Sequence, residues 1–507
     1  MTNIKKPSLL VSLIPIVILV SLIFLLSRLF SGDVTSGPAQ VALIVAGVLG
    51  ALIAITKYKV PWENLEEAML GNLKDTGGAL FILLMIGALT ATWVQSGVVP
   101  SLIYFGLKLI NPSAFLIVAF IFTAAISLML GSSWTTIGTI GIALLSAGQI
   151  LGLHAGWVAG AIISGAYFGD KLSPLSDTNN LAATIAGVKL YDNVKYLLIT
   201  NIPTVIITGI VFWIVGMNVN ASAPVDVQGQ IAAIKSTYNV SIWLLLIPAF
   251  TIFLMVKKIS PFLTLFLSAI FAGIVACVAQ PQIIGQISPF AAGDWRTYLY
   301  APVKIMAAHV DITAPNAMLT KLASTNGIGG MMNTIWLIMC ITIFGGVFEA
   351  AGYIKTITSK MDKMIRNTTS LVATTMGTCI FCNLTLSDQY MSIVVPGKML
   401  KQLYKEKGYE ARLLSRSIGD SATVFSVLVP WNTCGAMQSS VLGIPTLAYA
   451  PYCILNFVSP IVSLIVAAVG FKIFRWGKPL LKWHSGKPLE SVHEPEAEKH
   501  QSDEMDN

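Results

Sequence analysis

The stretch Gly169-Asp170-Lys171-Leu172-Ser173-Pro174-Leu175-Ser176-Asp177-Thr178-Asn179-Asn180 interrupts a very apolar part of the chain. It sets two carboxylates, an ammonium group, hydroxyls and amides around a proline. A charge inside a membrane span is costly, which makes it a candidate functional feature by default. A proline breaks a helix, and a broken helix is tolerated at membrane depth only where the freed backbone packs in protein or lines a cavity. The stretch therefore predicts a broken membrane helix that forms part of a functional site.

The composition of the chain is that of a protein that crosses a membrane many times. Of its 507 residues, 55% are hydrophobic and 11% are charged, and the mean hydropathy is +0.75. We therefore expect an all-α polytopic membrane protein. The net charge of +8 does not indicate nucleic-acid binding, because most Lys and Arg lie in loops and near the tail, where they set orientation. Segment 8–28 is too long and apolar for a removable signal peptide, so we expect it to remain as a span.

The apolar segments fall into two kinds. Uninterrupted segments are expected to be simple spans, and they cover 8–28, 38–56, 79–97, 196–218, 241–256, 261–279, 333–351 and 449–471. Regions 113–147 and 371–396 instead carry polar clusters near their middles. Region 157–190 contains the opening motif, and region 417–445 contains a similar one, so both are expected to be broken helices.

The distribution of Lys and Arg orders these segments across the membrane, because positive loops stay in the cytoplasm. Lys5 and Lys6 place the N-terminus inside. Both flanks of region 113–147 carry few positive charges, so this region is expected to enter from outside and return as a re-entrant hairpin. Region 371–396 lies between two basic clusters and is expected to do the same from inside. The pattern predicts about ten full crossings plus two hairpins, with both termini cytoplasmic.

An internal repeat relates the two halves of the chain. Ala68-Met69-Leu70 recurs as Ala317-Met318-Leu319, and Gly169-Asp170 recurs as Gly419-Asp420, both at an offset of about 250 residues. Each copy is expected to hold an odd number of crossings, which turns the second copy upside down relative to the first. Inverted repeats with paired discontinuous helices are typical of secondary transporters.

The repeat divides the chain into four parts. Residues 1–218 are expected to form the first transmembrane repeat, with hairpin 113–147 and broken helix 157–190. Residues 219–240 are an expected external linker. Residues 241–478 form the second, inverted repeat, with hairpin 371–396 and broken helix 417–445. Residues 479–507 are a polar cytoplasmic tail whose composition predicts disorder.

Four polar clusters are expected to converge where the repeats meet: the two hairpin tips and the two helix breaks. Their hydroxyl, amide and carboxylate oxygens are hard ligands suited to a small cation. The candidate ion- or substrate-binding residues are Ser132, Ser133, Thr135, Asp170, Ser173, Ser176, Asp177, Thr178, Asn179, Asn180, Asn383, Thr385, Ser387, Asp388, Asp420, Thr423, Asn432 and Thr433. The hypothesis for Na+ itself rests on Asp170, Asp177 and Asp420. A carboxylate removed from water is neutralised by a proton or by a cation, and this competition is the minimal device for antiport.

Simpler roles remain open for several of these residues. Lys171 is a possible charge partner, and Asp170 could form an ion pair with it or cap a helix. Asp177 is suited to a helix N-cap as well as to a ligand role. Ser387 and Asp388 could belong to the hairpin tip or cap the helix that follows it.

The motif Gly169–Ala182, GDKLSPLSDTNNLA, closely resembles the signature of NhaC-type Na+/H+ antiporters, GDKLSPLSDTTNLA. The stretches PWNTCGAM at 430–437 and CNLTLSDQY at 382–390 also resemble that family, and the resemblance covers nearly the whole chain except the tail. Asn179 departs from the usual Thr. The resemblance implies membership of the ion-transporter superfamily of inverted-repeat carriers. It also implies sodium sites at hairpin tips and unwound helices, and alternation between inward- and outward-facing states.

The leading functional hypothesis is Na+/H+ antiport by alternating access across a bacterial inner (plasma) membrane. The alternative is a coupled exchanger of organic acids, such as malate and lactate, or an amino-acid carrier of the same family. A carboxylate substrate favours an Arg, a Lys or a helix N-terminus, and no Arg is expected deep in a span. A passive channel is a third possibility. An enzyme is least expected, since no HExxH motif or Ser/His signature is present. The expected partners are Na+, H+ and the lipid bilayer, with an organic anion and a homodimer left open, and no cofactor is expected.

Overall fold

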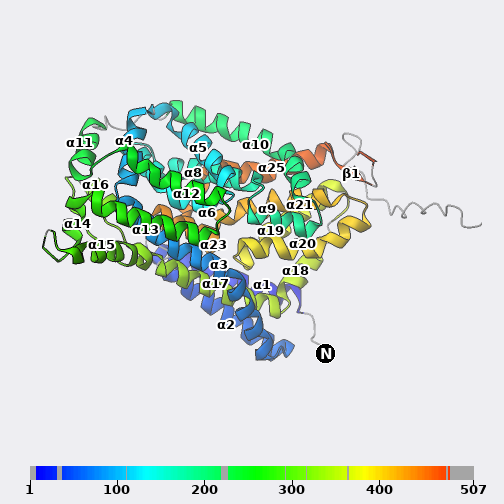
Figure 1. Cartoon of the computed structure of the whole chain (residues 1–507). Coiled ribbons are helices and arrows are strands. Elements are labelled where there is room, and N and C mark those ends of the chain that lie inside the picture. Colours follow the sequence, from blue (N-terminus) through cyan, green and yellow to red (C-terminus); the bar gives the residue numbers. More distant parts are fainter. Residues whose placement is uncertain are drawn as a thin grey trace, which may run out of the picture.

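A computed structural model of the chain describes residues 7–30, 37–109, 111–218, 227–291, 293–315, 317–361, 365–475 and 478–479. Almost all of this described chain is helical (Figure 1). The first half contains α1 (Leu9–Leu29), α2 (Pro38–Tyr58), α3 (Trp62–Gln95), α4 (Val98–Leu109), η1 (Pro112–Ala114), α5 (Phe115–Leu130), α6 (Ser133–Thr136), the π-helical turn η2 (Ile137–Gly141), α7 (Ile142–Ile150), α8 (Ala155–Leu172), α9 (Asp177–Ala186) and α10 (Leu190–Asn218).

The second half continues the helical architecture and adds a short strand pair. It contains α11 (Val227–Thr237), η3 (Ile242–Leu245), α12 (Leu246–Val256), α13 (Pro261–Ala279), α14 (Pro281–Ile287), α15 (Trp295–Ala307), α16 (Ala317–Ala323), η4 (Gly327–Met331), α17 (Met332–Ala350), α18 (Tyr353–Met361), α19 (Thr368–Thr385), α20 (Gln389–Glu406), α21 (Ala411–Gly419), α22 (Ala422–Phe425), η6 (Ser426–Leu428), α23 (Thr433–Leu442), α24 (Thr446–Tyr449), η7 (Ala450–Tyr452) and α25 (Ile454–Val469), followed by antiparallel β1 (Phe474–Arg475) and β2 (Lys478–Pro479).

The chain is an all-helical membrane protein. Within the described ranges, seven helices are long and apolar enough to cross a membrane: α1, α2, α3, η1 with α5, α10, α13, and η4 with α17. Two bent helix pairs, α11 with α12 and α24–η7 with α25, have the composition of further spans. Of the predicted external linker, residues 219–226 lie outside the described residues, and α11 occupies most of the rest. Residues 480–507 of the predicted tail also lie outside them.

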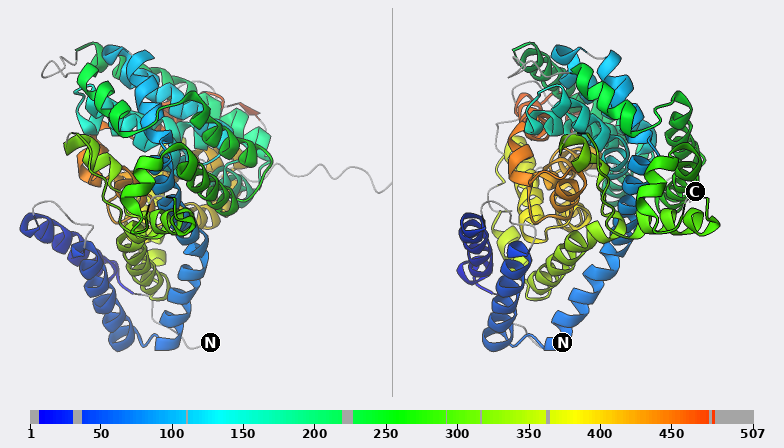
Figure 2. Two further views of the ribbon diagram at one scale, coloured as in Figure 1. Left: turned by 60° about the vertical axis from the view of Figure 1, so that its left-hand side comes forward. Right: turned by 90° about the vertical axis from the view of Figure 1, so that its left-hand side faces the viewer.

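The first three helices and α17 form one end of the molecule (Figure 2). α1 packs on α2, α2 packs on α17, and α17 packs on α3, which also contacts α13. α3 begins at Trp62, well before the expected start at 79, because its first part is polar and exposed, with Glu63, Glu66 and Glu67. Its apolar second part, from Leu83 onward, is buried almost continuously, whereas the first part buries only single residues such as Leu65.

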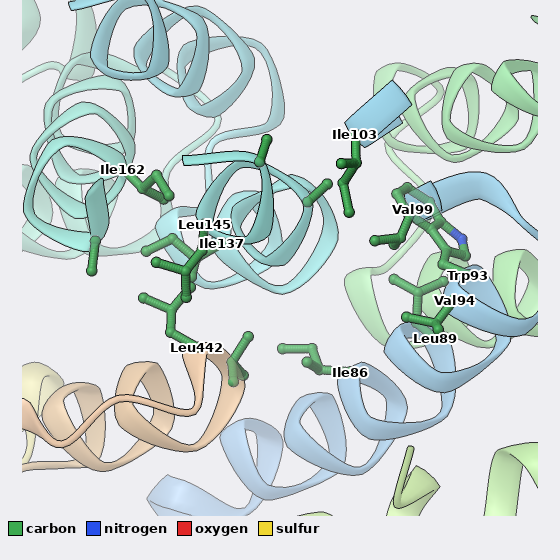
Figure 3. Close-up of a cluster of buried hydrophobic side chains, with 14 of the residues drawn as sticks. Ile86, Leu89, Trp93, Val94, Val99, Ile103, Ile137, Leu145, Ile162 and Leu442 are labelled. Atoms are coloured by element: carbon green, nitrogen blue, oxygen red, sulfur yellow. The ribbon is translucent and has the colours of Figure 1, made fainter. Parts of the chain in front are cut away.

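The main buried core surrounds the helices that carry the interrupted regions. Figure 3 shows apolar side chains from α3, α4, η2, α7, α8 and α23 that point toward a common interior. Leu442 of α23 is buried in the same cluster as Ile137 of η2 and Ile86 of α3. Elements from both halves of the sequence therefore share one core, and this core holds the broken helices in place.

α5 and α8 pack against each other more closely than any side chain would permit. A Cβ atom at Gly165 would lie 2.2 Å from the backbone O of Phe120, and one at Gly169 would lie 2.3 Å from that of Ala124. The spacing Gly165-xxx-Gly169 is the small-residue pattern that allows membrane helices to touch along their backbones. Ser127 Oγ adds a hydrogen bond of 2.6 Å to the Ala166 carbonyl. α5 therefore lies directly against the part of α8 that carries Asp170.

Candidate functional site

The first helix break lies where the opening motif predicts it. α8 ends at Leu172, and the residues around Pro174 form a turn before α9 begins at Asp177. Ser176 is the N-cap of α9, since its hydroxyl accepts the Asn179 N–H at 3.2 Å. Asp177 is therefore the first helical residue rather than the cap, and its Oδ1 accepts the Thr178 N–H at 2.8 Å.

Asp170 joins this break to the interrupted region before it. Its Oδ2 accepts the backbone N–H of Ser133 at 3.0 Å and the Ser133 hydroxyl at 2.7 Å. Ser133 opens α6, so the carboxylate lies at a helix N-terminus, where the peptide dipoles favour negative charge. In the part of the chain that the structure describes, Oδ1 of Asp170 has no hydrogen-bond partner, although the residue is only 6% exposed. One buried carboxylate oxygen is therefore available to a ligand.

The tip of this interrupted region contacts the break through its backbone. Gly131 has φ +70°, and a Cβ there would lie 2.7 Å from the Leu175 carbonyl carbon and 2.9 Å from the Ser176 nitrogen. Only glycine combines the left-handed backbone with this close approach at little cost. The tip and the break are thus pressed together beside Asp170.

The second interrupted region meets the second break in a similar way. Ser387 also has a left-handed backbone, with φ +57°, and its carbonyl accepts the Thr433 N–H at 2.8 Å. Asp388 caps α20 through the Met391 N–H at 3.0 Å, and its other oxygen accepts the Thr433 hydroxyl at 3.1 Å. Asn432 donates from Nδ2 to both the carbonyl and Oδ1 of Asn383, each at 3.1 Å.

A hydrogen bond links these two assemblies. The Tyr390 hydroxyl donates to Oδ2 of Asp177 at 2.6 Å, and α20 packs along α9. The structure thus brings Asp170, Asp177 and Asp388 into neighbouring positions, with no ion pair to any of them among the residues it describes. Within the same residues, no three His, Cys, Asp or Glu side chains meet closely enough to hold a metal ion. A cation here would need hydroxyl and carbonyl oxygens as well.

Asp420 has a different environment from Asp170. Its Oδ1 forms an ion pair with Lys171 Nζ at 2.5 Å and accepts the Thr200 hydroxyl at 3.1 Å. Lys171 also donates to Ser459 Oγ at 2.8 Å. Lys171 is thus a charge partner, but of Asp420 rather than of its neighbour Asp170. Both side chains of the pair are almost completely buried.

The remaining predicted residues lie beside these contacts, and most of their polar atoms bond to nearby backbone. Asn179 donates to the Ser173 carbonyl at 3.3 Å and accepts from Asn193 at 2.7 Å, so both ends of its amide have partners. The others form local caps and turns: Ser132 with Thr135, Ser173 with Leu175 N–H, Thr178 with Ser176, Asn180 with the Pro174 and Ser176 carbonyls, Thr385 with the Phe381 carbonyl, and Thr423 with the Gly419 carbonyl.

Sequence reasoning missed two residues of this region. Tyr390 stands in the quoted stretch CNLTLSDQY, but an aromatic beside a polar cluster gives no signal of its distant partner. Arg416 follows a run of basic residues that is typical of an inner loop, whereas the structure buries it completely. The available signal is the composition of α21, because Leu413, Leu414 and Ile418 lie on different sides of this short helix and predict that its second half is buried all round.

The chain is similar to known transport proteins over most of its length. The Na+/H+ antiporter family matches residues 165–471. The Na(+)/H(+) antiporter NhaC of Bacillus subtilis is 32% identical over 81% of this chain and 88% of its own length. The malate-2H(+)/Na(+)-lactate antiporter of the same organism is 32% identical over 85% and 90%. The arginine/ornithine antiporter ArcD of Halobacterium salinarum is 30% identical over 93% and 94%.

Proposed function

This chain belongs to the Na+/H+ antiporter family, and we propose that it is a multi-pass carrier of the bacterial plasma membrane that exchanges Na+ for H+. The observation that carries this proposal is the buried Oδ1 of Asp170, which lies among neutral oxygen groups and has no hydrogen-bond partner in the described chain. An unpaired carboxylate oxygen out of contact with water is stabilised when it takes up either a proton or a small cation. Na+ and H+ then exclude each other at one oxygen.

The proposed Na+ ligands come from the tip and from the break. Asp170 supplies the charge, while Ser133 and Ser176 supply hydroxyl groups that interact with its carboxylate. Asp177 interacts electrostatically with Asp170. It lies at the exposed side, where it can attract a cation from water. Asp388, Asn432 and Thr433, which contact one another, are the proposed ligands from the second assembly. Asp420 contributes less to Na+ binding in this conformation, because Lys171 already neutralises it.

We further propose that the two halves are inverted repeats that alternate access to this site. Several paired features support the symmetry. The left-handed residue and the following cap recur as Gly131-Ser132 and Ser387-Asp388. α2 packs on α17 while α13 packs on α3, which is the reciprocal pattern expected if α2 corresponds to α13 and α3 to α17. In this arrangement regions 113–147 and 371–396 are the hairpins, and both termini lie in the cytoplasm.

Organic-acid exchange is the second candidate, because the malate–lactate relative is as similar as the NhaC relative. A cavity of about 330 Å³ lies between α3, α7, α16 and α23, large enough for a small acid, with Lys321 as a charged lining residue. A dicarboxylate would require more positive charge than this cavity supplies. Arg416 is not among its lining residues. Na+ and H+ therefore fit the described site better than an organic anion does.

The decisive experiment compares cargoes in one preparation. Proteoliposomes containing the purified protein are loaded with Na+, Li+, K+ or labelled malate, and proton flux is followed with a pH-sensitive dye. We expect proton movement with Na+ in the absence of any organic acid. Proton flux that requires malate or lactate would instead establish the second candidate, and current without proton coupling would indicate a channel.

A further inference from the structure

A basic cleft lies between α9, α20 and α21, toward the C-terminal end of α20 and away from the proposed sodium ligands at its start. The three helices pack against one another (Figure 1). The cleft has a volume of about 590 Å³ and is lined by the exposed side chains of Lys398, Lys401 and Lys405 on α20. Its apolar lining includes Ala186 of α9 and Leu414 of α21. In the proposed orientation of the chain, this face is the cytoplasmic one.

The three lysines form one stripe along α20, because their spacing follows the helical period. Lys398 and Lys401 are three residues apart, and Lys401 and Lys405 are four apart, so the ammonium groups share one face of the helix. Like charges at these spacings destabilise a helix. The tendency of basic residues to collect on the cytoplasmic side explains their number, but not their alignment along one cleft. An anion in the cleft would relieve this repulsion.

None of the residues that line the cleft is acidic. Among the carboxylates of neighbouring segments, Glu410 is paired with Arg412, and Glu406 accepts a hydrogen bond from a side chain on its own helix. Glu349 of α17 interacts electrostatically with Lys398. In the part of the chain that the structure describes, none of the three lysines forms an ion pair. Their positive charge is therefore available to a ligand.

Two helix ends border the cleft and add to its preference for an anion. α21 begins at Ala411, which lines the cleft, and no side chain caps its first turn. The N–H groups at a helix N-terminus attract anions. Lys401 Nζ lies 3.3 Å from the place that a Cβ would take at Gly187, the C-cap of α9, and the peptide dipoles at this helix end favour the ammonium group.

We propose that this cleft binds a phosphate-bearing anion on the cytoplasmic side of the membrane. Ammonium groups and the N–H groups of a helix N-terminus are the donors that bind phosphate oxygens in proteins. Basic clefts between membrane helices on this side are suited to lipid headgroups. Two sources carry the group, the headgroup of an anionic phospholipid and a soluble phosphate compound. The apolar lining at Ala186 and Leu414 favours the phospholipid.

The test measures the thermal unfolding midpoint of the full chain in a neutral detergent. Short-chain phosphatidylglycerol is titrated in parallel with phosphatidylcholine of the same chain length. A ligand that binds only the folded state raises the midpoint, and it does so at lower concentration when it binds more tightly. We expect phosphatidylglycerol to raise the midpoint at concentrations at which phosphatidylcholine does not.

A pair of double variants locates the binding. Lys401→Gln/Lys405→Gln removes two of the three ammonium groups, so we expect it to need at least ~10-fold more phosphatidylglycerol for the same rise. The matched control is Lys57→Gln/Lys257→Gln, which removes the same charge from exposed lysines that do not line the cleft. This control should respond as the wild-type protein does.

Pyrophosphate, titrated at constant ionic strength, distinguishes the second source. A rise with pyrophosphate that the cleft variant loses would assign the site to a soluble phosphate compound, whereas the same pattern with phosphatidylglycerol would assign it to a lipid headgroup. Equal responses of the cleft variant and the control, or no response of the wild-type protein to either ligand, would overturn the inference. Binding is measured without transport, so a wild-type protein that exchanges no Na+ for H+ would remove only the proposed function.

Discussion

Gly169-Asp170 and Gly419-Asp420 have opposite electrostatic surroundings. Asp170 accepts hydrogen bonds from neutral donors of Ser133 and keeps one oxygen unused. Asp420 is also buried, but it forms an ion pair with Lys171. The same dipeptide therefore supplies a candidate cation ligand in one half of the chain and the counter-ion of the buried Lys171 in the other. Two identical dipeptides can thus have different chemical roles, because their partners differ.

The largest expected effect is on stability, and it separates a substitution of Asp420 from the same substitution of Asp170. Asp420→Asn leaves the buried Lys171 without its anion, so we expect the free energy of unfolding to fall by ~3–5 kcal/mol. Asp170→Asn replaces a carboxylate that has no cation partner and should change it by less than about 1 kcal/mol. Urea unfolding in detergent micelles compares the two. Equal losses would mean that the surroundings of the aspartates do not differ as described.

The second-largest expected effect is on transport, and here the substitution of Asp170 is the informative one. Asp170→Asn keeps an oxygen for the Ser133 donors but removes the charge that a cation needs. We expect Na+-dependent proton flux in everted vesicles to fall by at least roughly 100-fold, equivalent to about 3 kcal/mol of lost binding free energy. Unchanged exchange at saturating and at low Na+ would show that the ion is bound elsewhere.

A pair of glycines tests whether the contact between tip and break matters. Gly131→Ala must hold a left-handed backbone and also displace Leu175, at a combined cost of ~2–4 kcal/mol. Gly443 has a similar φ of +66° but no atom within 4 Å of a Cβ. Gly443→Ala should therefore cost only the backbone term of ~1–2 kcal/mol and preserve Na+ affinity. Matching losses of affinity in the two variants would contradict a role for the tip.

The smallest effect is expected at the link between the two assemblies. Tyr390→Phe removes the hydrogen bond to Asp177, which lies at an exposed position. We expect the Na+ concentration for half-maximal exchange to rise about threefold to fivefold, the equivalent of ~1 kcal/mol, with little change in maximal rate. A change in maximal rate alone would indicate that Tyr390 governs motion rather than binding.

The sequence predicted the helix breaks better than it predicted their partners. Pro174 and the capping residues around it act locally, and so the interruption after Leu172 could be read directly. The ion pair of Lys171 and Asp420 joins residues 249 apart in the chain. Nothing near Lys171 distinguishes that partner from the adjacent Asp170, because which side of the helix each side chain faces depends on tertiary packing.

Arg416 shows the second limit of sequence reasoning. It lies near the basic residues 398–412, and the rule that positive residues mark cytoplasmic loops groups it with them. The rule counts charges but does not ask which face of a short helix they occupy. The length of α3 was underestimated for a related reason, because hydropathy identifies only the part of a helix that is apolar.

The close contact of α5 with α8 has a mechanical consequence. At Gly165 and Gly169 the backbones of α5 and α8 touch, so no layer of side chains lies between the two helices that would let one move past the other. Any movement of α8 must carry α5 with it, so Asp170 and its hydrogen-bond donor Ser133 would move together. α9 and α20 instead meet through apolar side chains, with Ile185 against Gly397, and through the hydrogen bond from Tyr390 to Asp177. Pairs of cysteines crosslinked across α5–α8 or across α9–α20 would identify which of these helix pairs has to move apart during a transport cycle, because crosslinking that pair would stop transport.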